Sequence, residues 1–136
     1  MGALAEIRKA VLLSAPIEKV WNAVATSEGL AAWWMPNNLE PVLGHEFFLF
    51  TGQYGDSPCE VTELDPLRRF GFDWGKEWHL AFELREVDGK TELALIHSGW
   101  DSEKVTEFGQ PHTMIRGFME SGWGDLAALR KFVEGQ

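Results

Sequence analysis

The chain has 136 residues, 45% of them hydrophobic, and its 21 acidic against 12 basic side chains give a formal net charge of −9. A surface this acidic repels phosphate groups, which argues against nucleic acid and anionic membranes as partners. The length suits a single domain over residues 1–136, and no apolar run is long enough to insert into a bilayer. Together with a lone Cys59 and no signal-peptide layout, these features predict a cytoplasmic protein.

The first third of the chain predicts a strand followed by two short helices. Alternating apolar side chains indicate a strand over residues 5–13. The run SAPIEKVWNAVA predicts a helix, because apolar residues recur at helical spacing after Pro16, which suits a first turn. A second helix over residues 28–34 takes its N-cap from Thr26 or Ser27 and ends before Pro36.

From His45 onward the apolar spacing changes to that of strands. Short turns separate five predicted strands, HEFFLFT, PCEVTEL, RRFGFDW, WHLAFELRE and TELALIHS. Connections this short can join only antiparallel neighbours. We therefore predict an antiparallel meander that the N-terminal strand joins, giving a curved sheet of six to seven strands.

The segment 113–133 is the longest with a clean helical period. Its apolar stripe needs a large surface, which only the sheet provides, and consists of Ile115, Phe118, Met119, Gly122, Leu126, Leu129 and Val133. The result is an α+β fold with one long C-terminal helix over the sheet. Gly122 within the stripe indicates either a close approach of helix and sheet or room for a ligand beneath the helix.

Three runs carry a resemblance to a known group of proteins. SAPIEKVWNAVATSEGLAAWW resembles the opening of the helix-grip (SRPBCC) superfamily, which includes START lipid-transfer domains, birch-pollen allergens and polyketide cyclase-like proteins. TELALIHSGW and GWGDLAALRKF are similar to the branch related to the C-terminal domain of the activator of the heat-shock-protein-ninety ATPase. The likeness extends over residues 6–133 and implies the helix-grip fold.

The favoured hypothesis is the non-catalytic binding of a small, mostly apolar molecule, aromatic or acyl, between the sheet and the C-terminal helix. Rings and thioethers form an adaptable apolar lining, for which we expect Trp33, Trp34, Phe50, Trp74, Trp78, Phe82, Met114, Phe118 and Met119. His97 shares its strand parity with Leu93 and Leu95, so it should point inward as a polar anchor. No cofactor is predicted.

Two alternatives remain open. One is an enzyme of the cyclase or hydrolase type, in which His97 acts as a base together with an inward Glu46 or Glu63. Either carboxylate could instead reach solvent at a strand end. The other is a protein-interaction module of the chaperone-activator type, with a chaperone as partner. Under any of these hypotheses the protein could be a monomer or a homodimer.

The remaining histidines and the longest irregular segment do not point to a further catalytic or metal site. The four histidines, His45, His79, His97 and His112, lack the spacing of a metal site, so no metal is predicted. The irregular segment 99–112 has the length of a loop that covers a binding site.

Overall fold

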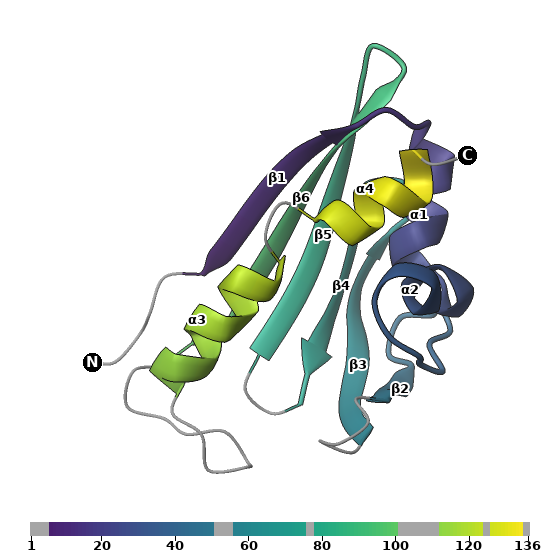
Figure 1. Ribbon diagram of the computed structural model, residues 1–136. Helices are drawn as coiled ribbons and strands as arrows, with labels where there is room; N and C mark the ends of the chain where they lie inside the picture. The colour runs from purple at the N-terminus through teal and green to yellow at the C-terminus, as the bar shows by residue number, and fades with distance from the viewer. Residues whose placement is uncertain (1–5, 51–55, 76–77, 101–111, 124–125, 135–136) are drawn as a thin grey trace.

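The computed structural model describes residues 6–50, 56–75, 78–100, 112–123 and 126–134. The elements follow one another along the chain (Figure 1) as β1 (Ile7–Leu13), α1 (Ile17–Ala25), α2 (Ser27–Trp33), β2 (Glu46–Phe50), β3 (Asp56–Asp65), β4 (Arg69–Trp74), β5 (Trp78–Val87), β6 (Lys90–Ser98), α3 (His112–Trp123) and α4 (Ala127–Glu134). This order confirms the predicted α+β fold.

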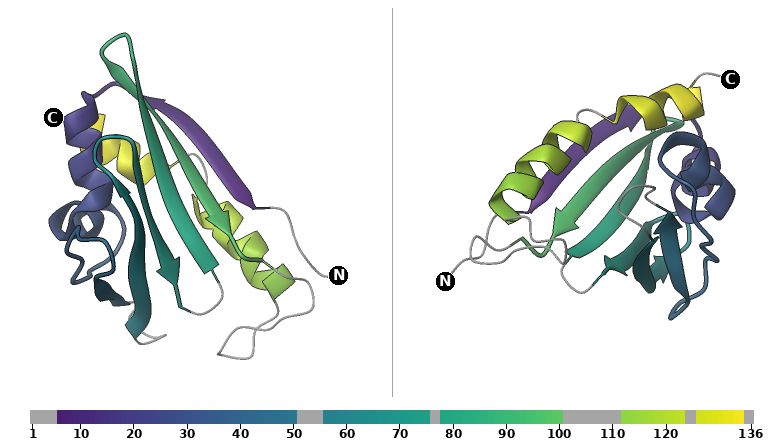
Figure 2. Two further views of the ribbon diagram at one scale, coloured as in Figure 1. Left: turned by 180° about the vertical axis from the view of Figure 1, so that it is seen from behind. Right: turned by 60° about the horizontal axis from the view of Figure 1, so that its bottom comes forward.

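The six strands form one antiparallel sheet in the order β1-β6-β5-β4-β3-β2. Strands β2 to β6 are the predicted meander, and β1 returns to pair with β6 in a register that sets Ile7 opposite His97. The helices lie on one side of the curved sheet, and the view from behind shows the strands in front of them (Figure 2). The sheet therefore has a helix-facing side and an outer side.

Alternation along the strands separates these two sides. On β5, Leu80, Phe82 and Leu84 are buried towards the helices, while His79 and Glu83 lie on the outer side. Complete burial of a phenylalanine ring stabilises the fold by about 2–3 kcal/mol. The largest fully buried rings are Phe47, Phe70, Phe72 and Phe82. The core thus lies between the sheet and the helices, as the apolar pattern of the strands predicts.

A glycine sets the close contact between α1 and α2. The side chain of Thr26 caps α2 by accepting a 3.0 Å hydrogen bond from the Gly29 N–H, and its hydroxyl donates to the Asn22 carbonyl of α1 at 2.6 Å. A Cβ on Gly29 would lie 2.0 Å from that same carbonyl oxygen. The absence of a side chain at residue 29 therefore allows α2 to pack onto α1.

The prediction of one continuous helix over residues 113–133 is wrong in one respect, because the segment forms the two helices α3 and α4. Leu126, between them, has a φ of +59°, a left-handed conformation that costs a bulky residue roughly 1–2 kcal/mol. Its side chain is only 3% exposed, and burial of that side chain offsets the cost. Helix α3 packs beside β1, whereas α4 packs against α1, α2 and β1.

No helix in the described part of the chain is both long and apolar enough to cross a membrane.

Candidate functional site

The helix-facing side of the sheet holds a cluster of tryptophan rings around His97. The ring centroid of His97 lies 4.7 Å from that of Trp100, 5.3 Å from Trp74, 5.7 Å from Trp78 and 6.1 Å from Trp123. Trp74 stacks on the imidazole at an interplanar angle of 16°. We call these tryptophans, together with two more at the end of α2, the indole cluster, which consists of Trp33, Trp34, Trp74, Trp78, Trp100 and Trp123.

Strand ends bring these residues together. Trp74 ends β4 and pairs with Trp78 at the start of β5, while His97 lies near the end of β6. Because neighbouring strands run antiparallel, these three positions meet at the same end of three adjacent strands inside the sheet. Trp100 follows β6 and donates a 3.0 Å hydrogen bond from its Nε1 to the His97 carbonyl oxygen, and Trp123 is the last residue of α3.

The end of α2 supplies the remaining rings. Trp34 contacts Trp74 and Trp123 at centroid distances of 5.4 and 5.3 Å, and Trp33 stacks on Trp34 at 6.1 Å. Trp33 Nε1 donates to the Ala23 carbonyl of α1 at 2.8 Å, which fixes the orientation of this ring. The packing of α2 on α1 therefore determines where these two indoles lie.

His97 is a neutral group within the cluster. Its side chain is 0% exposed, and its Nδ1 accepts a 3.1 Å hydrogen bond from Trp123 Nε1. Burial is the main reason that the pKa of His97 falls to about 3, and the positive charge of Arg116 and, less, the ring of His79 lower it further. A group with this pKa is a poor proton acceptor, so the hypothesis of His97 as a general base loses support.

Most of the residues expected to line the site do lie together. A chain of ring contacts links Trp33, Trp34, Trp74, Trp78, Phe82 and His97. Met119 is partly buried against the core, whereas Met114 is 41% exposed. The side chain of Phe118 and the space beneath Gly122 lie outside the described part of the structure, as does most of the segment 99–112.

Phe50 does not lie where the sequence predicts. It is 37% exposed and lies on the outer side of β2 with Phe48, while Phe47 and Leu49 point into the core. The run EFFLF is apolar at both parities, so alternation within the run cannot decide which face is buried.

The site also contains three buried residues that were not among the expected lining: Trp100, Trp123 and His112. The ring of His112 lies 5.7 Å from both Trp78 and Trp100. Trp123 follows Met119 by four residues, a helical spacing that could have identified it. Nothing in the spacing of an irregular segment indicates that Trp100 is buried.

Both candidate carboxylates lie away from His97. Glu46 is exposed at the start of β2, and Glu63 lies on the outer side with Arg69 and His79. A register shift between Val61 and Glu63 reverses the parity of β3 at this point. A Cβ on Gly71 would approach Glu63 Oε2 to 2.5 Å, so the carboxylate lies across this glycine. The proposed pairing of His97 with an inward glutamate is therefore wrong for these two residues.

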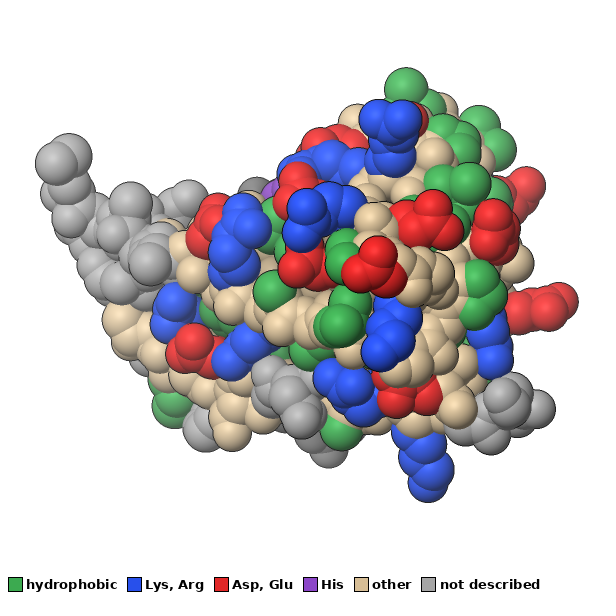
Figure 3. All heavy atoms as spheres, turned by 90° about the horizontal axis from the view of Figure 1, so that it is seen from above, with side chains coloured by type: hydrophobic (Ala, Val, Ile, Leu, Met, Phe, Trp, Pro, Cys, Tyr) green, Lys and Arg blue, Asp and Glu red, His purple; other side chains and the backbone are tan. Residues whose placement is uncertain are grey.

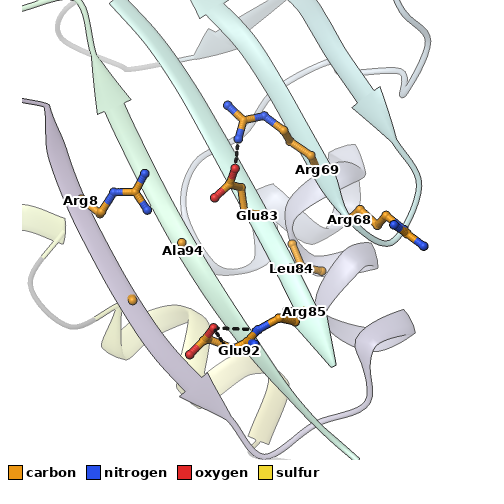
Figure 4. Close-up of a pocket in the computed structure, with 9 residues that line it drawn as sticks. Arg8, Arg68, Arg69, Glu83, Leu84, Arg85, Glu92 and Ala94 are labelled. Atoms are coloured by element: carbon orange, nitrogen blue, oxygen red, sulfur yellow. Dashed lines mark hydrogen bonds and ion pairs between the residues drawn. The ribbon is translucent and has the colours of Figure 1, made fainter. Parts of the chain in front are cut away.

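The outer side has a depression of its own. It has a volume of about 480 Å³ and is lined by Arg8, Ala10, Arg68, Arg69, Glu83, Leu84, Arg85, Glu92 and Ala94. Arg69 pairs with Glu83, and Arg85 pairs with Glu92 at 2.8 Å (Figure 4). Viewed from above, the surface likewise intersperses acidic and basic side chains (Figure 3). The internal ion pairs satisfy much of the charge in this depression, so it does not resemble a site for an apolar ligand.

Solved structures share this fold. The chain is similar to protein BH1534 of Bacillus halodurans, with 40% identity, a TM-score of 0.86 and coverage of 98% of this chain and 99% of that chain. Protein MLL2253 of Mesorhizobium loti is 20% identical over 96% and 98% of the two chains, with a TM-score of 0.82. The Aha1 dimer of Colwellia psychrerythraea is 23% identical over 96% and 97%, with a TM-score of 0.76.

A search of curated protein sequences gave no match. The profile of one family, described as Activator of Hsp90 ATPase homolog 1-like protein, matches residues 14–133, which is nearly the whole chain. The match confirms the resemblance carried by the tryptophan-rich opening and the GWGDLAALRKF run. The chain belongs to the Activator of Hsp90 ATPase homolog 1-like protein family.

Proposed function

We propose that the protein binds a small, mostly apolar molecule, aromatic or acyl, on the helix-facing side of the sheet. The main support is that three rings of the indole cluster, Trp33, Trp34 and Trp78, pack against the core but remain only half-buried. A large ring that packs against the core but stays partly open to water gains apolar contact when a ligand covers it.

The polarity of the cluster supports the same ligand class. His97 is neutral at physiological pH, and the rings that surround it carry no charge. A cationic ligand would lose its hydration there without an opposite charge in return, and the positive charge of Arg116 nearby would repel it. An apolar body with few polar groups suits this environment better.

The test is a titration of intrinsic tryptophan fluorescence with a panel of flavonoid-like and fatty-acyl compounds, preceded by native mass spectrometry of the purified protein for co-purifying small molecules. We expect micromolar binding of at least one compound, and Trp34→Ala should weaken it about tenfold by removing a half-buried contact ring. Trp21→Phe is the control, because the ring of Trp21 packs on Phe70, which is not a member of the indole cluster.

A flat titration with every compound, in a protein that gives a well-dispersed NMR spectrum, would contradict ligand binding. Equal losses of affinity in Trp34→Ala and Trp21→Phe would place the binding site elsewhere.

A protein-interaction role is a second candidate, favoured by apolar side chains on the surface. Phe48 and Phe50 are 42% and 37% exposed on the outer side of β2, and Val42 and Leu43 are exposed in the preceding loop. Exposed apolar groups of this kind mark many protein-binding surfaces. The family description suggests the Hsp90 ATPase as a partner, and an ATPase assay with wild-type protein and Phe48→Ser tests this candidate.

A further inference from the structure

The hydrogen bond between Trp123 and His97 determines which nitrogen of the imidazole carries the proton. An indole N–H can only donate, so the 3.1 Å contact requires an unprotonated Nδ1 on His97 as its acceptor. The imidazole is neutral and holds a single ring proton, which must then lie on Nε2. His97 therefore presents Nε2–H as a donor and has no remaining ring acceptor.

This donor is buried and has no hydrogen-bond partner among the described residues. The same is true of the Nε1–H of Trp78, another buried donor of the indole cluster. The two rings are neighbours, with centroids 5.7 Å apart and an interplanar angle of 87°. Buried N–H groups are rarely left without a partner in folded proteins, because water has been removed without replacement.

No backbone carbonyl among the described residues accepts a hydrogen bond from either donor. The His97 carbonyl oxygen already accepts from Trp100 Nε1, and an indole N–H of Trp123 occupies Nδ1. His97 and Trp78 thus each present one buried N–H donor without an acceptor, and neither ring has an acceptor left to offer. A ligand complements such a site by providing an acceptor oxygen.

We propose that His97 Nε2–H and Trp78 Nε1–H bind the carbonyl oxygen of an aromatic ketone or acyl compound. This inference rests on the proposed function and specifies the polar group of its ligand. A carbonyl oxygen has two lone pairs, so it can accept from both donors without bringing a charge into the cluster. A ligand whose only polar group is a donor, such as an ammonium group, leaves both N–H groups unsatisfied.

The first experiment concerns the protein without ligand. Long-range 1H–15N correlation spectra report separately on the two imidazole nitrogens of His97. We expect Nε2 to be protonated and Nδ1 to be unprotonated at neutral pH, and Trp123→Phe to allow exchange between the two tautomers. A protonated Nδ1 in the wild-type protein overturns the inference, whatever the protein binds.

The second experiment uses two matched probes, 2-acetylnaphthalene and 2-ethylnaphthalene, which differ mainly in the carbonyl oxygen. Calorimetry or NMR titration should show about tenfold tighter binding of 2-acetylnaphthalene, as expected for hydrogen bonds made in a buried site. His97→Phe should remove this preference while retaining affinity for 2-ethylnaphthalene, and Trp78→Phe should reduce it. His79→Phe is the matched control, because His79 lies on the outer side and should leave the preference unchanged.

The outcomes separate the two proposals. Equal affinity for both probes in the wild-type protein overturns the carbonyl assignment and leaves apolar ligand binding intact. Binding of neither probe, together with a flat titration of the wider panel, overturns both. If His97→Phe does not fold, Trp78→Phe decides the matter, since an unchanged preference in this variant contradicts the role of its N–H.

Discussion

At the scale of single residues, the burial of His97 makes the stability of the folded protein depend on pH. Its neutral form fits between the rings of Trp74 and Trp100, whereas its charged form would have to be desolvated there. Burial accordingly lowers the pKa of His97 from the ordinary 6.5 to about 3. In the unfolded chain the imidazole returns to water and to its ordinary pKa.

We predict that acid destabilises the protein through this residue. Between about pH 6.5 and pH 3 the unfolded chain binds a proton at His97 that the folded protein excludes, so the stabilisation is complete above the unfolded pKa and is lost as the pH falls. Since each pKa unit corresponds to about 1.4 kcal/mol, the loss across the window is on the order of several kcal/mol. Urea unfolding at a series of pH values gives the free energy of unfolding.

The control is His97→Gln, which should flatten this dependence between pH 6.5 and 5. Glu63 adds a separate dependence at lower pH, because its hydrogen bond with Arg69 lowers the pKa of this carboxyl below 4.5. An unchanged slope between pH 6.5 and 5 in the variant would show that His97 does not titrate on unfolding.

At the scale of elements, two helical glycines have opposite roles. Gly29 lies where α2 touches the backbone of α1, and a Cβ there would come within 2.0 Å of the Asn22 carbonyl and 2.7 Å of the Ala23 Cα. A Cβ on Gly117, on the exposed side of α3, would meet nothing within 4 Å. The same substitution should therefore change stability in opposite directions at these two positions.

We predict that Gly29→Ala destabilises the protein by about 3 kcal/mol, since the helices must separate to admit the methyl group. Gly117→Ala should stabilise it by roughly 0.5–1 kcal/mol, because alanine is the better helix former. Chemical denaturation of both variants measures the two changes. A neutral effect of Gly29→Ala would mean that α1 and α2 do not pack as closely as described.

The strands and first helices could be predicted from the sequence because their spacing is unambiguous. Phe70, Phe72 and Trp74 alternate on β4, and all three are buried as expected. Two features of the fold could not be predicted from the apolar spacing, for physical reasons. The register shift of β3 sets Glu63 opposite Gly71 of the neighbouring strand, a tertiary pairing that local alternation does not encode. Apolar residues continue in nearly the same phase across the break at Leu126.

The candidate site was partly predictable for related reasons. Residues on strands with one apolar parity, such as Trp78 and His97, could be assigned to the interior. Trp100 follows the end of β6, where no period exists, and its burial depends on tertiary contacts with His97 and Trp78. Local sequence shows which face of a strand a residue occupies. It does not show that residues from several separate segments pack together into one cluster.

At the scale of the whole molecule, the sheet separates two surfaces with different chemistry. The helix-facing side contains the indole cluster, and the outer side contains ion pairs among Arg69, Glu63 and Glu83 together with the exposed rings of Phe48 and Phe50. Side chains of one strand alternate between the two surfaces, so a substitution on one side need not disturb the other. The two candidate functions of the protein therefore use different faces.

We predict that Phe50→Ser leaves the affinity for an apolar ligand unchanged within about twofold, although phenylalanine is the more apolar residue. The ring of Phe50 is part of the outer surface, and its backbone N–H, which donates to the Pro36 carbonyl at 2.9 Å, remains available in the variant. Trp34→Ala, on the helix-facing side, should weaken the same ligand about tenfold. Fluorescence titrations of both variants with one ligand measure the contrast, and NMR spectra check that both remain folded. Loss of affinity in Phe50→Ser would show that ligand binding extends to the outer face.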